Sequence, residues 1–515
     1  MHLGRATLAA LSAATALAAC SPDDTTSPAV APALAREAAV GFRTSQPAQA
    51  RALRPEAEVI PILTVGDILP GSNLPWAPLP DGLGAFRERG EVMLFANHEL
   101  SASGVKSTNG GPTYAYARVS RLRLNPTTLR VLGGDYIEDG SGGYERLCSA
   151  TWAGAGVGLP TGYFLTGEEQ GASARGSIAL AYTAQGQKYE LPHLGSFSHE
   201  NTVAVPGFGA RVVLMGLDDS NGQSELYMYV ADDEAAFLAG SGKLYVFKTD
   251  VLSSAGKPLH AGNMTVGQEV PGYFVEVPDP ADLGAPTPAS RYARLQAKVD
   301  GLGAMPFVRI EDGDYDRSPG SATRKPTFYF VDTGNSGIRG RTQVGADCGG
   351  VCDLAGSIYR LDLNPADPTR GARLWLLDRS QGAAAGWASP DNIAVSSKSI
   401  MVMEDPAYTG FDGSRAPAIW NARLLPKGKL GAFTKVVELT QEQLIPGTAG
   451  KCVDATGGCW ESSGIISGEG LVGPGTWLFD VQAHTLPFSV PNATGGQDTY
   501  GGESGQLLLL RQPGS

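Results

Sequence analysis

Residues 211–230 read RVVLMGLDDSNGQSELYMYV, and this stretch decides the fold class. Its first half is a short apolar run that ends at the acidic pair Asp218-Asp219. Its second half alternates Tyr227 and Tyr229 with Leu, Met and Val, so that every second side chain points to one face, as in a half-buried antiparallel strand. Asn and Gly between the halves favour a turn. The stretch therefore predicts two short β-strands.

Both halves of this pattern recur along the chain. Apolar runs that lead to acidic residues occupy 92–96, 163–166 and 399–403, and alternating runs that contain a tyrosine occupy 242–247 and 356–362. Repeated short hairpins predict an all-β fold, and their number favours a β-propeller with long inserted loops around a central channel. We expect six blades from the length of the chain. A large β-sandwich or several small all-β domains is the alternative interpretation.

The composition agrees with a fold rich in turns. The 515 residues include 68 Gly and 35 Pro, and residues 291–299 form one of the few helical candidates. We expect the folded domain to occupy residues 57–515 and to begin with a strand near residues 59–65. A last apolar strand at 506–511 could complete a blade that begins near the N-terminus.

The N-terminus predicts export. Residues 1–20 read as a lipoprotein signal peptide in which Cys20 would be lipidated, and residues 21–56 read as a flexible linker. A plain secretory signal is the alternative. Either interpretation puts the protein in the cell envelope, anchored by lipid on the periplasmic or surface face, or outside the cell. No later apolar stretch is long enough to cross a bilayer, so membrane contact would be through the lipid only.

The net charge of −12 comes from 40 Lys and Arg against 52 Asp and Glu. An acidic surface repels nucleic acid and argues against a nucleic-acid partner. It suits a protein that binds cations, although ordinary solubility explains the same charge. We expect a monomer.

Five of the six cysteines can be assigned without a reactive thiol. Cys348 with Cys352 and Cys452 with Cys459 are short-range disulfide candidates in an exported protein, and a zinc site built from these four is the alternative. With Cys20 lipidated, Cys148 alone is left over. An exported protein rarely keeps one free thiol without a function, so Cys148 is the candidate thiolate ligand of a metal centre.

The acidic residues that follow the apolar runs supply further candidate ligands, with the solvated turn as the alternative for each pair. Carboxylates select calcium, magnesium, manganese or ferric iron, whereas a thiolate favours a transition metal, so the mixture suggests two kinds of metal in one site. Arg309 and Glu311 lie two residues apart and would share a strand face. A metal at Glu311 beside the Arg309 guanidinium would suit a phosphate group, whereas a surface ion pair is the alternative.

Seven short motifs follow one another in a recognisable order. They are Asn97-His98-Glu99, Arg146-Leu147-Cys148-Ser149, Leu165-Thr166-Gly167-Glu168-Glu169, Phe197-Ser198-His199-Glu200, Arg309-Ile310-Glu311, Pro390-Asp391-Asn392 and Phe479-Asp480-Val481-Gln482-Ala483-His484. Together they resemble the motif set of the PhoX-type alkaline phosphatases, a family that depends on calcium and iron.

The resemblance implies an exported β-propeller that hydrolyses small phosphorylated substrates, phosphomonoesters, with iron and calcium at the channel mouth. A metal-activated oxo or hydroxide would attack the phosphorus atom. Carried over by position, Cys148, Glu200 and Glu311 resemble the family's metal ligands, and Arg309 resembles its phosphate-binding arginine. The acidic pair Glu168 and Glu169 resembles a further metal-binding motif.

The chain departs from the family pattern at three positions. It has only Arg5 and a lipobox where the family has a twin-Arg export signal, Gly167 stands where the family has a Cys, and Ala483 interrupts the late Gln-His motif. A propeller of the same family that binds a ligand or partner protein without turnover is therefore the second hypothesis. A calcium-dependent propeller lactonase or phytase fits the acids but leaves Cys148 unexplained.

Overall fold

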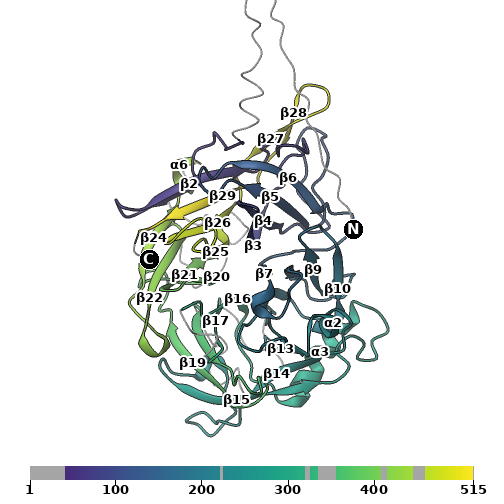
Figure 1. Cartoon of the computed structure of the whole chain (residues 1–515), viewed down its shortest axis with the longest axis vertical. Coiled ribbons are helices and arrows are strands. Elements are labelled where there is room, and N and C mark those ends of the chain that lie inside the picture. Colours follow the sequence, from purple (N-terminus) through teal and green to yellow (C-terminus); the bar gives the residue numbers. More distant parts are fainter. Residues whose placement is uncertain are drawn as a thin grey trace, which may run out of the picture. The chain divides into compact units, whose positions relative to one another are not determined.

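Strands account for most of the regular structure of the protein (Figure 1). The computed structural model describes residues 41–220, 224–318, 325–334, 355–406, 415–444 and 459–513. The predicted signal peptide with Cys20, and most of the predicted linker, lie outside these residues. Within them, no helix has both the length and the apolar character that a membrane span requires.

The strands pair into sheets of unequal size. One four-stranded sheet contains β3 (Pro80–Glu88), β4 (Glu91–His98), β5 (Arg118–Leu124) and β6 (Val131–Glu138). A second contains β7 (Thr151–Ala153), β8 (Tyr163–Gly167), β9 (Ala179–Thr183) and β10 (Lys188–Leu191). A third contains β2 (Glu58–Thr64), β29 (Ser504–Arg511), β26 (Thr476–Ala483) and β25 (Glu461–Ser467) in that order.

Two sheets are larger. A nine-stranded sheet runs through β11 (His199–Ala204), β12 (Val212–Asp218), β13 (Leu226–Ala231), β14 (Lys243–Lys248), β15 (Glu269–Val277), β19 (Ala372–Arg379), β18 (Ser357–Asp362), β17 (Thr327–Asp332) and β16 (Ile310–Tyr315). A six-stranded sheet contains β1 (Ala50–Ala52), β24 (Thr434–Leu439), β22 (Ala418–Leu425), β21 (Ser399–Glu404) and β20 (Pro390–Val395), with β23 (Lys429–Leu430) paired to β22.

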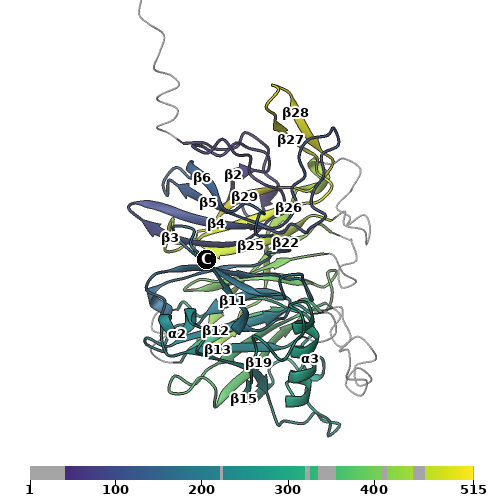
Figure 2. The same ribbon diagram turned by 90° about the vertical axis from the view of Figure 1, so that its right-hand side faces the viewer.

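Few elements lie outside these sheets. The hairpin of β27 (Phe488–Pro491) and β28 (Gln497–Tyr500) extends from the body of the molecule (Figure 2). The α-helices of the described residues are α2 (Glu234–Leu238), α3 (Ser290–Leu302) and α6 (Gln441–Leu444). Helix α3 confirms the helical candidate at 291–299.

The stretch that decided the fold class forms the paired strands β12 and β13, as predicted, with Leu214 opposite Tyr229. The expectation of a half-buried strand was wrong, because both faces of β13 are covered. Tyr227 and Tyr229 pack into one apolar cluster, whereas Leu226 and Met228 pack into another. A sheet that has neighbours on both sides buries both of its faces, and this explains the almost uninterrupted apolar sequence of β12.

The innermost strands form a closed ring. Strand β3 contacts β7, and the contacts continue through β11, β16, β20 and β25 back to β3 (Figure 1). This is a propeller-like, all-β arrangement, as predicted. The predicted number of six blades is not confirmed by the hydrogen bonding, because one sheet runs continuously through nine strands.

The last strand of the chain pairs with a strand near the start of the described residues. Strand β2 pairs with β29, with Ile60 opposite Leu509, as predicted for the last apolar strand. The linker prediction needs one correction, because β1 lies within residues 21–56 yet pairs with β24 and buries Ala50. An edge strand obtains its order from backbone hydrogen bonds to its neighbour, so it needs no apolar periodicity of its own.

Candidate metal centre

Polar side chains converge at one end of the ring. Six pairs of antiparallel strands contribute them. In most pairs the inner strand contributes its second residue, and the next strand contributes the residue just after its end. The contributing residues are Asp81 and Glu99 at β3–β4, Cys148 and Glu169 at β7–β8, Glu200 and Asp219 at β11–β12, Glu311 at β16–β17, Asp391 and Asp405 at β20–β21, and Glu461 and His484 at β25–β26.

The starts of the inner strands are irregular in a consistent way. The pairing register shifts between Pro80 and Leu83, and equivalent shifts flank Glu200, Glu311 and Asp391. A β-bulge turns a side chain away from the regular alternation of the strand, and bulges are common beside active sites. The bulges therefore turn these acids towards the ring axis.

The resulting cavity has a volume of about 200 Å³ and an extreme charge. Its thirteen lining residues are Asp81, Glu99, Arg146, Cys148, Glu169, Glu200, Asp219, Arg309, Glu311, Asp391, Asp405, Glu461 and His484. Nine of them are carboxylic acids, against two arginines and one histidine. Carboxylates at this density are stable only when they are protonated, paired or bound to cations.

Cys148 is buried and is the free cysteine among the described residues. Its thiol donates a hydrogen bond to Oε2 of Glu169 at 2.9 Å. Its carbonyl accepts from the Gly82 amide at 3.1 Å and from Nδ2 of Asn97 at 2.5 Å. Only glycine fits at position 82, because a Cβ there would lie 2.3 Å from the carbonyl oxygen of Cys148. The backbone around Cys148 is therefore fixed before any ligand binds.

Three overlapping groups of side chains have the geometry of cation sites. They are Asp81 with Glu99 and Cys148, Cys148 with Glu169 and Glu200, and Glu200 with Glu311 and Asp391, and within each group the ligand atoms lie within 4.8 Å of one another. Cys148 and Glu200 are each shared by two groups, so cations bound in these groups would be close neighbours.

The electrostatics of the cavity fit bound cations. Burial and the neighbouring carboxylates raise the pKa of Glu169 to about 7 and raise the pKa values of Glu200, Glu311 and Asp391 well above their usual range. Burial, followed by Glu169 and other acids, also raises the pKa of the Cys148 thiol. A cation would replace the protons that these groups otherwise retain. Thiolate with carboxylate is a donor set that suits a transition metal beside calcium.

The two arginines of the cavity differ in their surroundings. Arg309 is only 5% exposed, and its Nη2 donates to Oδ2 of Asp219 at 2.6 Å and lies 3.2 Å from Oε1 of Glu311. Arg309 and Glu311 therefore line the same cavity. Arg146 is more exposed, and its guanidinium bridges Glu169 and Glu99. Both arginines adopt a left-handed backbone conformation, with φ of 59° and 50°.

Glu168, one of the predicted ligands, lies outside the cavity. Its carboxylate accepts hydrogen bonds from the Ser173 hydroxyl at 2.7 Å and from the Glu145 amide at 3.1 Å. The two acids of the pair point to opposite sides of the chain, because successive side chains of an extended backbone alternate. The structure thus separates Glu169, which lines the cavity, from Glu168, which stabilises the backbone around it.

Several cavity residues were not predicted as ligands. Asp81 and Glu461 were not considered at all, and Asp391 was noted only as part of a motif. The sequence does contain an indication for Asp81. In Pro80-Asp81-Gly82, as in Pro390-Asp391-Asn392, an acid follows a proline and is the second residue of a strand. The same position holds Glu200 in β11 and Glu311 in β16.

His484 lies just beyond the end of β26, between two glutamates. Its Nδ1 lies 2.5 Å from Oε2 of Glu503, and its Nε2 lies 3.9 Å from Oε2 of Glu461. Burial lowers the pKa of His484, but the hydrogen bonds and the charges of Glu461 and Glu503 outweigh burial and raise the pKa well above its usual value. The imidazole is therefore held as a proton-carrying group at the cavity wall.

Three of the predicted disulfide cysteines, Cys348, Cys352 and Cys452, lie outside the described residues. The fourth, Cys459, is buried. The two disulfide pairings stay predictions.

A closed ring of strands with a buried cavity of carboxylates, one thiol and two guanidiniums defines the class of the protein as a propeller-like metalloenzyme that acts on an anion. The family described as alkaline phosphatase PhoX matches residues 181–449, more than half of the chain, and the protein belongs to this family. Its members are metal-dependent phosphoric monoester hydrolases, and so is this chain. The matched residues include Glu200, Arg309 and Glu311, whereas Cys148 and Glu169 precede them.

One solved structure supports the fold. Pseudomonas fluorescens PhoX, in complex with the transition-state analogue vanadate, is 15% identical, with a TM-score of 0.61 over 92% of this chain and 98% of that chain. The neuraminidase-like protein of subtype N11 from A/flat-faced bat/Peru/033/2010 is 9% identical over 85% of this chain and 89% of that chain. Its TM-score of 0.34 is too low to carry an argument. No curated protein sequence matches the chain.

Proposed function

We propose that the protein is an exported phosphatase that hydrolyses phosphomonoesters in the carboxylate cavity, with iron and calcium as its cations. The observation that carries the proposal is the convergence of Cys148, Glu169, Glu200 and Glu311 with Arg309 in one cavity. The family supports a small phosphorylated substrate. A cavity of about 200 Å³ suits a phosphate group together with its cations, so the rest of the substrate would remain at the mouth.

The residues divide between two kinds of cation. Cys148 with Glu169 and Glu200 would hold iron, because this group contains the thiolate. Glu200 with Glu311 and Asp391 would hold calcium, because all of its donors are carboxylate oxygens. When bound, the cations supply charge neutralisation for the phosphate oxygens and a water molecule of lowered pKa.

Arg309 binds the phosphate in this proposal. Its guanidinium is anchored by Asp219 and stands beside Glu311, so it is already oriented when substrate arrives. A pre-oriented guanidinium stabilises the charge that develops on the phosphate oxygens in the transition state. Burial strengthens this interaction, because little water competes for the guanidinium.

His484 donates a proton to the leaving group in this proposal. Glu503 fixes the Nδ1 side of the ring, which leaves the proton on Nε2 at the cavity wall beside Glu461. As the bond from phosphorus to the leaving oxygen breaks, the Nε2 proton passes to that oxygen, and the water that attacks phosphorus supplies the replacement proton. The raised pKa of His484 favours the protonated imidazolium that this role requires.

The remaining parts of the proposal concern the whole chain. The six strand pairs around the cavity are the inner halves of six blades, with the nine-stranded sheet supplying two of them. The N-terminal segment directs export and anchors the protein by a lipid on Cys20, and the folded unit works as a monomer. The cysteines outside the cavity form the disulfides Cys348–Cys352 and Cys452–Cys459.

The experiment uses the full chain purified from its native compartment. Phosphate release from an aryl phosphate is measured together with the iron and calcium content. We expect turnover in the wild type and a fall of roughly 100-fold or more in kcat/KM in Arg309→Lys, with unchanged metal content. Cys148→Ser should lose both iron and turnover.

The matched control is Glu91→Gln, which removes an acid paired with Arg123 at the surface. It should retain full activity and metal content. A wild-type protein that binds the metals yet never releases phosphate would contradict the proposal and favour a binding protein of the same fold.

A further inference from the structure

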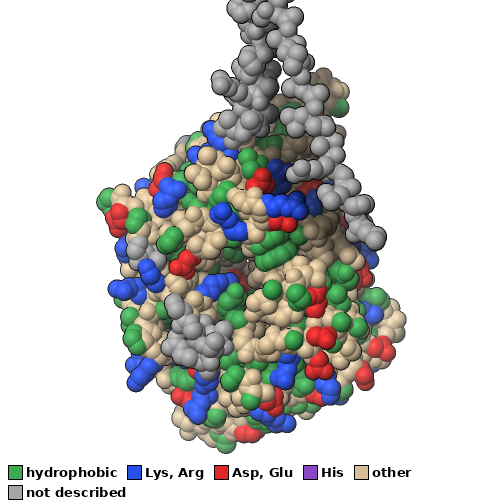
Figure 3. Space-filling model, in the orientation of Figure 1, with side chains coloured by type: hydrophobic (Ala, Val, Ile, Leu, Met, Phe, Trp, Pro, Cys, Tyr) green, Lys and Arg blue, Asp and Glu red, His purple; other side chains and the backbone are tan. Residues whose placement is uncertain are grey.

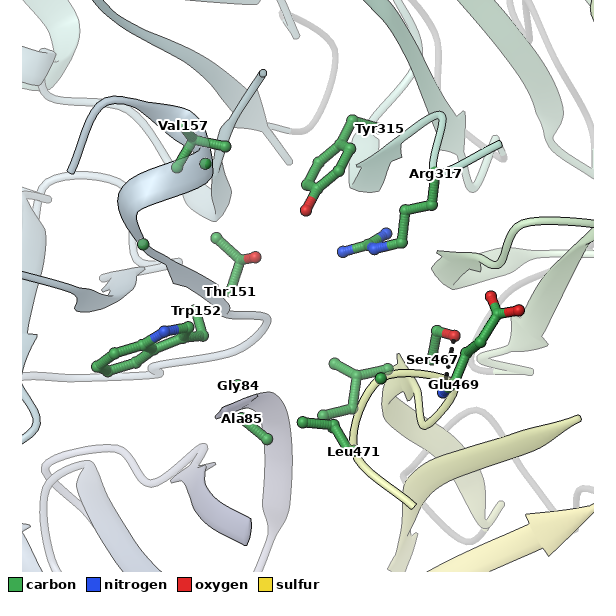
Figure 4. Close-up of a pocket in the computed structure, with 14 residues that line it drawn as sticks. Gly84, Ala85, Thr151, Trp152, Val157, Tyr315, Arg317, Ser467, Glu469 and Leu471 are labelled. Carbon is green, nitrogen blue, oxygen red and sulfur yellow. Dashed lines mark hydrogen bonds between the residues drawn. The ribbon is translucent and has the colours of Figure 1, made fainter. Parts of the chain in front are cut away.

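A second cavity lies at the other end of the inner strands (Figure 4). Its volume is about 340 Å³, within the range typical of small-molecule sites. Strand β3 reaches it with Gly84 and Ala85, and β7 reaches it with Thr151. Along β3, Asp81 lines the carboxylate cavity and Gly84 lines the second cavity three residues later, which places these two positions roughly 10 Å apart at about 3.3 Å per residue.

The two cavities have separate linings, because no residue lines both of them. At the level between them, neighbouring strands of the ring are in close contact: the Gly82 amide bonds to the Cys148 carbonyl, and a Cβ on Gly464 would lie 2.6 Å from the Asp81 carbonyl oxygen. A ligand in the second cavity would therefore contact a set of residues distinct from the phosphate-binding residues.

Three hydrogen-bond donors converge in the second cavity. Thr151 of β7 and the neighbouring Tyr315 and Arg317, at the end of β16 and just beyond it, point their side chains towards the same space (Figure 4). The hydroxyl oxygen of Tyr315 accepts a hydrogen bond from Arg317, and within the described part of the chain no acceptor is found for the hydroxyl protons of Thr151 and Tyr315. Converging donors without acceptors are the arrangement that binds an oxyanion.

Arg317 is held in position but keeps donors for a ligand. One of its guanidinium nitrogens, Nη1, pairs with Asp314 and donates to the Val395 carbonyl at 3.2 Å. The guanidinium carbon lies 4.1 Å from the centre of the Tyr315 ring. The side chain is 31% exposed, so its other nitrogens can reach the cavity. A guanidinium fixed on one side loses little conformational entropy when it binds an anion on the other.

The nearby acid, Glu469, is engaged by a residue outside the cavity lining. Both carboxylate oxygens of Glu469 are bound by Ser397, to the amide at 3.0 Å and to the hydroxyl at 2.6 Å. Across from Arg317 the lining is apolar, with Ala85 and Leu471 near each other, whereas Val157 lies apart from them on the side of Tyr315 (Figure 4). On the face of the molecule drawn in Figure 3, basic and acidic side chains are mixed.

We infer that this cavity is a second binding site, for a small organic oxyanion whose apolar group lies against Ala85 and Leu471. Arg317 pairs with the oxyanion, and the hydroxyls of Thr151 and Tyr315 donate to it. The site is separate from the phosphatase centre and does not depend on the bound metals. Its ligand chemistry is that of an aromatic or aliphatic carboxylate or phosphonate.

The test is calorimetric titration of the full-length, metal-loaded protein with benzoate and with phenylphosphonate, which cannot be hydrolysed at its carbon–phosphorus bond. We expect the wild type to bind benzoate, and Tyr315→Phe and Thr151→Val each to weaken binding about tenfold or more. Arg317→Gln should weaken it further. Because these two hydroxyl variants keep the charge and nearly the shape of the site, they decide the question even if Arg317→Gln fails to fold.

Two controls locate the ligand. Arg309→Lys alters the phosphatase centre and should bind benzoate as the wild type does, as should Arg123→Gln at the surface. The affinity for phenylphosphonate, compared with that for benzoate, shows whether the site prefers a phosphonate or a carboxylate. Any of three results would overturn the inference. The wild type binds neither benzoate nor phenylphosphonate, or Tyr315→Phe and Thr151→Val bind benzoate as tightly as the wild type does, or benzoate binding is lost in Arg309→Lys alone. Benzyl alcohol bound as tightly as benzoate would overturn the assignment of an oxyanion.

Discussion

At the scale of single residues, His484 determines how the leaving group departs. A general acid matters most when the leaving alcohol is a poor leaving group, because an alkoxide needs a proton and a nitrophenolate does not. We expect His484→Gln to lower kcat/KM for an alkyl phosphate by roughly 100-fold or more and to change that for p-nitrophenyl phosphate by less than about tenfold. The measurement is a comparison of both substrates at saturating metal.

Glu503→Gln is the companion variant, because Glu503 holds Nδ1 of the ring without lining the cavity. It should shift the same selectivity in the same direction by a smaller factor. Equal losses on both substrates would show that His484 has a structural role and would remove it from the mechanism.

Residue chemistry also explains which parts of the site the sequence could predict. Cys148 stood out because an unpaired cysteine is rare in an exported protein, and Arg309 because a guanidinium two residues from an acid is a short-range pattern. Asp81 and Glu461 could not be singled out, because each is one acid among 52 and gains meaning only when β-strands far apart in the chain bring it to the axis. Glu168 was misplaced because sequence alone does not show which side of the chain faces the cavity.

At the scale of elements, the site depends on the close approach of β3 to the segment before β7. Gly82→Ala would place a Cβ 2.3 Å from the Cys148 carbonyl oxygen and push Cys148 away from its partners. We expect a loss of about 1–3 kcal/mol in the free energy of unfolding, as for other overpacked positions, together with weaker metal binding. Chemical unfolding and elemental analysis of the purified variant check this.

Gly301→Ala is the matched control, because Gly301 lies in α3 and has no atom within 4 Å of its would-be Cβ. It should leave metal binding intact and stabilise the helix by up to about 1 kcal/mol. A Gly82→Ala protein with normal stability and metal content would show that the approach of β3 does not position Cys148.

The element types were more predictable than their connections. Alternation at 225–230 and the apolar run at 211–215 correctly predicted β13 and β12, and the helical pattern at 291–299 correctly predicted α3. The nine-stranded sheet was not predictable, because the pairing of β15 with β19 joins segments almost a hundred residues apart and depends on backbone hydrogen bonds rather than on a local pattern. Strand β1 was missed for the same reason.

At the scale of the whole molecule, the buried acids link stability to pH. In the metal-free protein, burial raises the pKa values of Glu169 and Asp312 to about 7, compared with about 4 in an unfolded chain. Between these values the folded protein binds more protons than the unfolded chain, so its free energy of unfolding falls as pH rises. We expect the melting temperature of the chelated protein to fall by several degrees between pH 5 and 8.

Calcium should oppose this fall, because a cation replaces the protons that the carboxylates lose. The difference in melting temperature between calcium-loaded and chelated protein should therefore grow with pH. A chelated protein that becomes more stable from pH 5 to 8 would contradict the charge distribution derived for the cavity.

The most direct test of the central claim is to locate the metals in the protein as purified from its native compartment. Anomalous X-ray diffraction at the iron edge shows where iron is bound, and the same preparation is assayed for phosphate release. The account predicts an active enzyme with iron bound by Sγ of Cys148 together with the carboxylates of Glu169 and Glu200. An active enzyme with no metal in this cavity, or with its iron bound elsewhere, would contradict it.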